Sequence, residues 1–201
     1  MEKKKILYMT ELGILTAILI LMQFTPIGYL RIGIVSITFM AIPVSVGAIV
    51  LGPLAGVILG AVFGITSLIQ CFMGDAFGIA LLSIDPALTA ILCIVPRVLV
   101  GLASAYVFKL FKNKKGILSY AVSALSASVV NTVGFIFGLT FLFGNTEFIG
   151  GLIDTMGGGN IFVFFIAFAT FNAVIEAIAC CLVGGTLSKV TYKAVNAKYL
   201  F

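Results

Sequence analysis

The sequence predicts an all-α integral membrane protein, a compact bundle of six transmembrane helices with both termini in the cytoplasm. Of the 201 residues, 62% are hydrophobic and 9% are charged, and the mean hydropathy is +1.27. Soluble domains usually carry about 25% charged residues, so this composition excludes a soluble fold. Six apolar runs are each long enough for a bilayer crossing, which takes about 20 residues. We expect a single domain over residues 1–201.

The first three predicted spans are residues 6–25, 33–51 and 54–73. The first follows three lysines, and no small-residue cleavage site interrupts it, so we interpret it as a span and not as a cleaved signal peptide. The second contains Pro43 and begins with polar residues, so we expect a kink or partial unwinding beside a cavity. The third follows the turn Gly52-Pro53.

The other three predicted spans are residues 86–110, 118–143 and 161–189. Turn-forming residues precede each of them, namely Gly74-Asp75, Asn113 to Gly116, and three glycines at 157–159 followed by Asn160. The outer loop 144–160 is glycine-rich, and such a loop can fold over a site as a lid.

The charges predict the orientation of the bundle. One side would carry the lysines at positions 3–5, 109, 112, 114, 115, 189, 193 and 198, whereas the other carries Arg31 with Asp75, Asp85, Glu147 and Asp154. Short loops rich in Lys and Arg stay cytoplasmic. The net charge of +5 is therefore interpreted as a topology signal and not as a nucleic-acid-binding face.

Small residues recur every four positions in two of the predicted spans. They are Gly52, Gly56, Gly60 and Gly64 in the third span and the pair Gly13 and Ala17 in the first. Such stripes allow close approach of another helix. We expect the longer stripe to pack inside the bundle. The shorter pair is equally compatible with internal packing and with a contact to another subunit.

Four polar residues are predicted to share the middle of the membrane. Arg97 lies roughly eleven residues into the fourth span and Asn131 roughly thirteen into the fifth. Asn172 and Glu176 lie in the sixth span, four residues apart and hence on one helix face. Three successive helices would thus bring polar groups to one depth.

Arg97 and Glu176 are the opposite charges at this depth, and buried ionisable groups need partners. One interpretation is a structural ion pair that Asn131 and Asn172 support. The other is that Arg97 faces a cavity and binds an anionic ligand group, with Glu176 orienting it, since a guanidinium is a planar fork that suits a carboxylate. A proton relay through Glu176 is disfavoured, because no chain of acids or histidines crosses the bilayer.

Further candidate ligand contacts lie toward the outer side. They are Gln70 and Thr66 near the end of the third span and Tyr29 in the first outer loop. Several phenylalanines, Phe135 among them, could wall a pocket, although lipid contact or core packing is favoured for each alone.

The sequence lacks the motifs of several function classes. It has no histidine, no Walker A motif and no HExxH or GxSxG pattern. We therefore expect no enzyme activity, no metal and no cofactor in this chain. A small polar cavity in a helix bundle favours a substrate-binding subunit over a stand-alone ion-coupled permease, which remains the alternative from another class.

Two stretches resemble a known family. The run GAIVLGPLAGVILGAVFGITS, residues 47–67, is similar to the corner between the second and third helices of substrate-binding S components of energy-coupling factor (ECF) vitamin transporters. The run VPRVLVGLASAYVFKLFK, residues 95–112, resembles their fourth helix, particularly in the pantothenate-specific branch.

The resemblance implies a mechanism and partners. An S component binds its vitamin from outside, docks on a transmembrane coupling subunit, and topples to release the vitamin, while two ATPase subunits drive the cycle in the cell membrane of a prokaryote. Family members often carry an Ala-x-x-x-Ala docking surface on the first helix, for which Gly13 and Ala17 are the nearest match here. With pantothenate, Arg97 would pair with the carboxylate, and Asn131, Asn172 and Gln70 would serve its hydroxyls and amide. A pyridoxine-type or hydroxymethylpyrimidine-type substrate is the alternative within the family.

Overall fold

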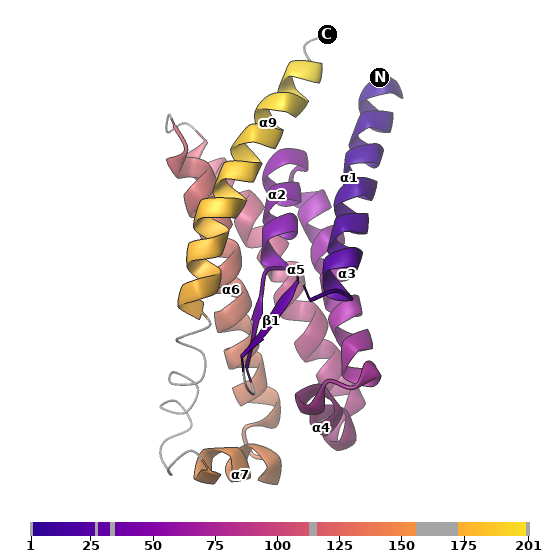
Figure 1. Cartoon of the computed structure of the whole chain (residues 1–201), viewed down its shortest axis with the longest axis vertical. Coiled ribbons are helices and arrows are strands. Elements are labelled where there is room, and N and C mark those ends of the chain that lie inside the picture. Colours follow the sequence, from indigo (N-terminus) through magenta and orange to yellow (C-terminus); the bar gives the residue numbers. More distant parts are fainter. Residues whose placement is uncertain (1, 27, 33–34, 113–115, 156–172, 200–201) are drawn as a thin grey trace.

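A computed structural model describes residues 2–26, 28–32, 35–112, 116–155 and 173–199. The molecule is an elongated helix bundle in which the start of α1 and the end of α9 lie at one end, and α4 and α7 lie at the other (Figure 1). In chain order the elements are α1 (Glu2–Gln23), β1 (Tyr29–Ile32), β2 (Val35–Thr38), α2 (Ala41–Leu51), α3 (Pro53–Met73), α4 (Ala76–Ile84), α5 (Pro86–Phe111), α6 (Leu118–Phe143), α7 (Glu147–Thr155), η1 (Cys180–Gly184) and α9 (Gly185–Tyr199).

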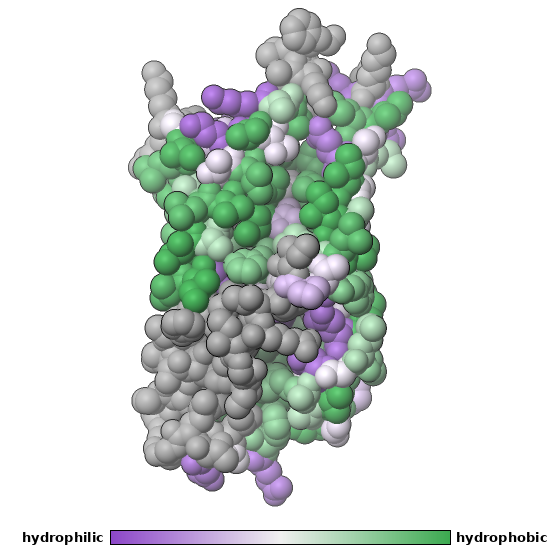
Figure 2. Space-filling model, viewed as in Figure 1, coloured by the Kyte–Doolittle hydropathy of each residue, from purple (hydrophilic) through white to green (hydrophobic). Residues whose placement is uncertain are grey.

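Within the described ranges, five helical segments are long and apolar enough to cross a membrane, and a further apolar helix, α2, is shorter. The helices predicted at 54–73, 86–110 and 118–143 are confirmed as α3, α5 and α6, and α1 begins slightly before the predicted 6–25. Of the predicted sixth span, residues 161–172 lie outside the described residues, and the fifth candidate span covers Ala173–Val195. On the face shown in Figure 2, a broad hydrophobic belt separates two ends that carry hydrophilic residues.

The second predicted span, 33–51, was wrong as a single helix. Residues 35–38 form strand β2, which pairs antiparallel with β1 so that Tyr29 lies opposite Thr38. The β-branched residues of VSIT favour a strand, whereas Pro43 is tolerated at the third position of α2 because the first helical turn needs no internal N–H bond. The 11 residues of α2 rise about 16 Å, roughly half of the hydrocarbon core. The bundle is therefore helical except for one short hairpin among the described residues.

Close packing of α3 on α5 fixes the centre of the bundle. A Cβ atom on Gly56 would lie 2.7 Å from the Gly101 carbonyl oxygen, and one on Gly64 would lie 2.7 Å from the Ile94 Cα. A Cβ on Gly60 would collide with the Arg97 carbonyl oxygen. The prediction that this stripe packs internally is confirmed for these three glycines. Gly52 differs, because it forms the turn between α2 and α3 with φ +98° and touches nothing there.

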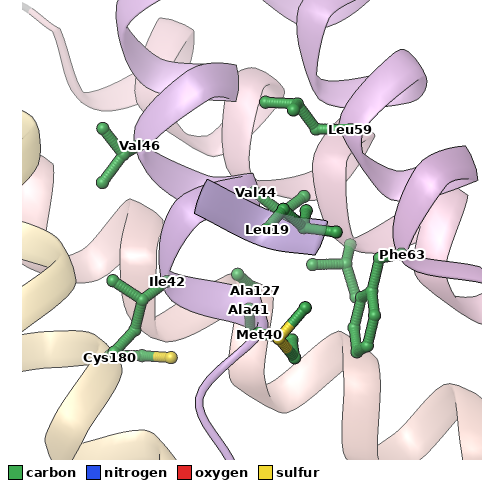
Figure 3. Packing of buried hydrophobic residues seen from close by; sticks show 11 residues of the cluster. Leu19, Met40, Ala41, Ile42, Val44, Val46, Leu59, Phe63, Ala127 and Cys180 are labelled. Atoms are coloured by element: carbon green, nitrogen blue, oxygen red, sulfur yellow. The ribbon is translucent and has the colours of Figure 1, made fainter. Parts of the chain in front are cut away.

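One hydrophobic core, to which α2 contributes several residues, connects most helices of the bundle. Buried side chains of α1, α2, α3, α5, α6 and η1 converge there, and Figure 3 shows them around Val44 and Leu19. A second buried cluster lies between α4, α5, α6 and α7, and includes Leu92 and Phe143.

The helix α5 begins at a side-chain cap. Asp85 accepts hydrogen bonds from the backbone N–H groups of Ala87 at 2.8 Å and Leu88 at 3.0 Å, and Pro86 occupies the first turn of α5. These features fix the start of α5 and, through the helical rise, the depth of Arg97. In the predicted outer loop 144–160, the structure places α7, and residues 156–160 lie outside the described ones.

Candidate functional site

Arg97 satisfies a backbone carbonyl that Pro96 leaves without its helical partner. In a regular helix the N–H of residue 96 would bond the carbonyl of Leu92, but proline has no N–H. The Arg97 side chain turns back along α5, and its Nη1 donates to the Leu92 oxygen at 2.8 Å. One donor of the guanidinium therefore repairs the helix, and no described residue accepts a hydrogen bond from its other donors.

The Arg97 guanidinium lies between two aromatic rings. Its Cζ is 5.6 Å from the ring centroid of Phe63 on α3 and 5.2 Å from that of Phe135 on α6. Rings at this distance attract a cation through their quadrupoles but accept no conventional hydrogen bond from it. The Nε atom is buried and has no hydrogen-bond partner. The rings thus hold the cation in position and leave its donors available.

Glu176 holds the hairpin in place from the last helix. Its side chain is 5% exposed, and Oε1 accepts a 2.7 Å hydrogen bond from the backbone N–H of Thr38 at the end of β2. The side chain of Asn131, 6% exposed, lies close to Glu176, and its Oδ1 has no hydrogen-bond partner. A carboxylate, an amide and the end of a strand therefore meet between α6, the last helix and the hairpin.

The predicted ion pair between Arg97 and Glu176 is absent among the residues that the structure describes. Each side chain makes a hydrogen bond to backbone instead, Arg97 to the Leu92 carbonyl and Glu176 to the Thr38 N–H. Their helices meet through α6, where a Cβ on Gly134 would lie 3.1 Å from the Pro96 Cβ and Asn131 lies one turn away. The arrangement is two neighbouring polar clusters of opposite charge rather than one closed salt bridge.

Gln70 and Thr66, which were predicted as ligand contacts toward the outer side, form hydrogen bonds within the bundle. Gln70 Nε2 donates to the Gln23 carbonyl at 2.6 Å and so ties α3 to the end of α1. The Thr66 hydroxyl donates to its own helix at Val62, 2.9 Å away, whereas the buried hydroxyl of Ser67 has no partner. Gln70 lies roughly 10 Å further along α3 than Phe63, so it belongs to the rim and not to the Arg97 cluster.

Of the two other predicted residues, Tyr29 is described in part and Asn172 is not described. The backbone of Tyr29 lies in β1 opposite Thr38, next to the bond that Glu176 accepts. Asn172 lies outside the described residues, one position before the described part of the last helix.

Gly13 and Ala17 lie on the exposed side of α1. A Cβ on Gly13 would meet no atom within 4 Å, unlike those on the packed glycines of α3. Both are separate from the polar clusters, so they are candidates for an intermolecular contact and not for ligand binding.

The sequence reasoning missed Phe63 and the backbone N–H of Thr38. Gly60 packs on the Arg97 backbone, and Phe63 lies one turn further along α3. The glycine stripe could therefore have predicted that the Phe63 ring lies near Arg97. No local signal pointed to Thr38, because its N–H is available only as a result of the hairpin.

Together these groups offer a cation with free donors, an amide oxygen, a carboxylate and aromatic walls at mid-depth in an apolar bundle. They can recognise a small polar molecule with an anionic group, and the described residues show no nucleophile paired with a base. A sequence model of the family described as "ECF transporter, substrate-specific component" matches residues 7–184. No curated protein matches the chain.

Proposed function

Since the chain belongs to the family of ECF transporter substrate-specific components, we propose that it is the high-affinity binding subunit of an ATP-driven importer for pantothenate. The family consists of transport subunits and not of enzymes. The main support for an anionic substrate is Arg97. It is a mid-membrane cation whose Nε is buried without a partner.

An anionic substrate group would complete the environment of Arg97. A charged side chain at this depth is costly, with at least roughly 2.5 to 3.5 kcal/mol on insertion scales. The guanidinium makes one hydrogen bond to Leu92, and the aromatic rings cannot satisfy its other donors. A carboxylate would accept two parallel hydrogen bonds from the planar fork and neutralise the charge.

The rest of pantothenate is a chain with hydroxyls and an amide. We assign its hydroxyl and amide contacts to Asn131, Asn172 and Gln70, with Glu176, Thr66 and Tyr29 in supporting positions. The partnerless Oδ1 of Asn131 supports this assignment, because it is a buried acceptor suited to a substrate O–H or N–H. The short α2 supports a cavity at this level, because irregular backbone at membrane depth occurs where it is buried in protein or lines a cavity.

We further propose that Gly13 and Ala17 contact the transmembrane coupling subunit, and that two ATPase subunits supply the energy. The open space at Gly13 supports this contact, since a second helix can approach there closely. The lysine-rich end, which bears both termini, would face the cytoplasm of a prokaryote under the positive-inside rule.

Calorimetric titration of the purified chain with a vitamin panel tests the substrate. We expect tight binding of pantothenate and weak or no binding of pyridoxine and hydroxymethylpyrimidine. Arg97→Ala should weaken binding at least about 30-fold, because a buried charged partner is lost. Arg97→Lys should cost about tenfold, because the charge stays but the fork is lost.

A double variant separates ligand binding from helix repair. Arg97→Ala alone also leaves the Leu92 carbonyl without a donor, so it could act by distorting α5. In Pro96→Ala with Arg97→Ala, the new backbone N–H at position 96 restores the helical bond. If the double variant binds pantothenate as tightly as Pro96→Ala alone, Arg97 does not bind the substrate. Tight binding of a different vitamin would replace pantothenate and leave the family membership intact.

A further inference from the structure

A cavity lies at the lysine-rich end, far from the mid-membrane residues. It has a volume of about 360 Å³ and lies between the end of α5, the start of α6, and α9. Lys112, which lines it, is 15 residues beyond Arg97 on the α5 side, a rise of roughly 22 Å. The two sites are therefore separate.

Three aromatic rings form a packed cluster in the lining of this cavity. The ring centroids of Phe108 and Tyr120 are 5.0 Å apart, those of Phe108 and Tyr192 are 5.4 Å apart, and those of the two tyrosines are 5.7 Å apart. Edge and tilted contacts at these distances are favourable and fix the rings. The cluster gives the cavity an ordered apolar wall and two phenolic hydroxyls that can donate hydrogen bonds.

Three lysines from two helices complete the lining. Lys112 follows α5, and Lys189 and Lys193 lie one turn apart on α9. Among the residues that the structure describes, no carboxylate lines the cavity and none of the three lysines forms an ion pair. Like charges four residues apart on a helix repel each other. An anion between them would remove this repulsion.

We infer that this cavity binds a phosphate group, the chemistry shared by the headgroup of an anionic phospholipid and a free phosphate anion. Lysine binds phosphate as a point charge, and the hydroxyls of Tyr120 and Tyr192 would add donors. The cavity lies at the basic end of a membrane bundle, where pockets between helices can receive lipid headgroups. The proposal is independent of which vitamin the mid-membrane site binds.

The position of Lys109 provides a matched control. It lies in the last turn of α5, carries the same charge and lies at the same end of the molecule. Its Nζ lies 5.4 Å from the ring centroid of Tyr106, and it does not line the cavity. A general attraction of the basic end to anionic surfaces would respond equally to the loss of Lys109 or of a cavity lysine.

Binding of lipids to the purified full chain, measured by native mass spectrometry, tests the proposal. The probes are dioleoylphosphatidylglycerol, dioleoylphosphatidylcholine and inorganic phosphate. We expect the phosphatidylglycerol to bind more tightly than the phosphatidylcholine. Lys112→Gln, Lys189→Gln and Lys193→Gln should each lower the affinity about fivefold, while Lys109→Gln should leave it unchanged. Tyr192→Phe keeps the ring cluster and should cost about threefold through the lost hydroxyl.

Competition between the probes distinguishes a lipid headgroup from a free phosphate anion. Competition by inorganic phosphate at millimolar concentration would identify a free anion as the ligand, and phosphatidylglycerol binding without such competition would identify a lipid headgroup. The proposal is overturned if Lys109→Gln weakens binding as much as the cavity variants. It is equally overturned if neither phosphatidylglycerol nor phosphate binds in preference to phosphatidylcholine.

Discussion

The helices α1 and α3 both carry small residues four positions apart, but they use them in opposite ways. On α3, Gly56, Gly60 and Gly64 press against the backbone of α5, and half of the most apolar window of α3 is buried. On α1, Gly13 has open space in front of it, and 11% of the corresponding window is buried. The same pattern therefore builds the interior in one helix and exposes a surface in the other.

This difference has a consequence for the proposed binding site. The packed stripe holds the Arg97 backbone against Gly60 and brings Phe63 to the guanidinium, so one wall of the site rests on rigid backbone contacts. The loosely packed α1 is free to meet another helix without disturbing that wall. Binding and coupling would then be carried by separate helices.

Gly60→Leu should have the largest effect. The nearest atoms to a Cβ there belong to the backbone of Arg97 and Val98, which cannot rotate away, so we expect a loss of about 3 kcal/mol of stability. Thermal unfolding in detergent, followed by size exclusion, measures it, with Gly13→Leu as the matched control. An unchanged unfolding temperature would show that α3 and α5 separate more easily than the structure implies.

Glu176→Ala should cause the second-largest loss of stability. It removes a hydrogen bond between the hairpin and the last helix, whereas Gly60→Leu disrupts a close backbone contact. Removing the acceptor leaves the Thr38 N–H unsatisfied, with a cost of about 2 kcal/mol. Hydrogen exchange at Thr38 should accelerate in step with the loss of stability. Glu176→Gln retains an acceptor and should cost less; equal losses in the two variants would mean that the charge matters more than the bond.

Gly13→Leu should leave stability and pantothenate binding unchanged and act on coupling alone. A bulky side chain in the open space would block close approach, so we expect recovery of the coupling subunit by co-purification to fall about tenfold. Ile14→Ala, on the same exposed helix, controls for a general change of the α1 surface. Undiminished co-purification would place the coupling surface on another helix.

Pro96→Ala should have the smallest effect. The new N–H would take over the Leu92 carbonyl from Arg97, so one donor replaces another and stability should change by less than about 1 kcal/mol. The same unfolding assay measures it. A large stabilisation would show that Arg97 repairs the helix poorly, and a large loss would show that the ring of Pro96 is needed for packing against Gly134.

Much of the helical architecture was predictable, because an apolar run of bilayer length has few alternatives to a helix. The boundaries of α3, α5 and α6 followed from Gly, Pro and Asp at their ends, where capping and turn chemistry is local. The hairpin was not predictable as such, since its strands have four residues each and its bond to Glu176 joins residues 138 positions apart. The sequence signalled only that the second span was irregular.

By itself, the sequence determined the membrane class and the helix-forming runs, and it predicts the sidedness of the lysines and a mid-depth position for Arg97 and Glu176. All of these depend on composition or on the fixed rise of a helix. Only the tertiary structure decided that Arg97 repairs α5 between Phe63 and Phe135, that Glu176 holds a strand in place of an ion pair, and that α1 leaves Gly13 open. Those outcomes depend on which helix faces turn toward one another, and that choice is made by the packing of the whole bundle.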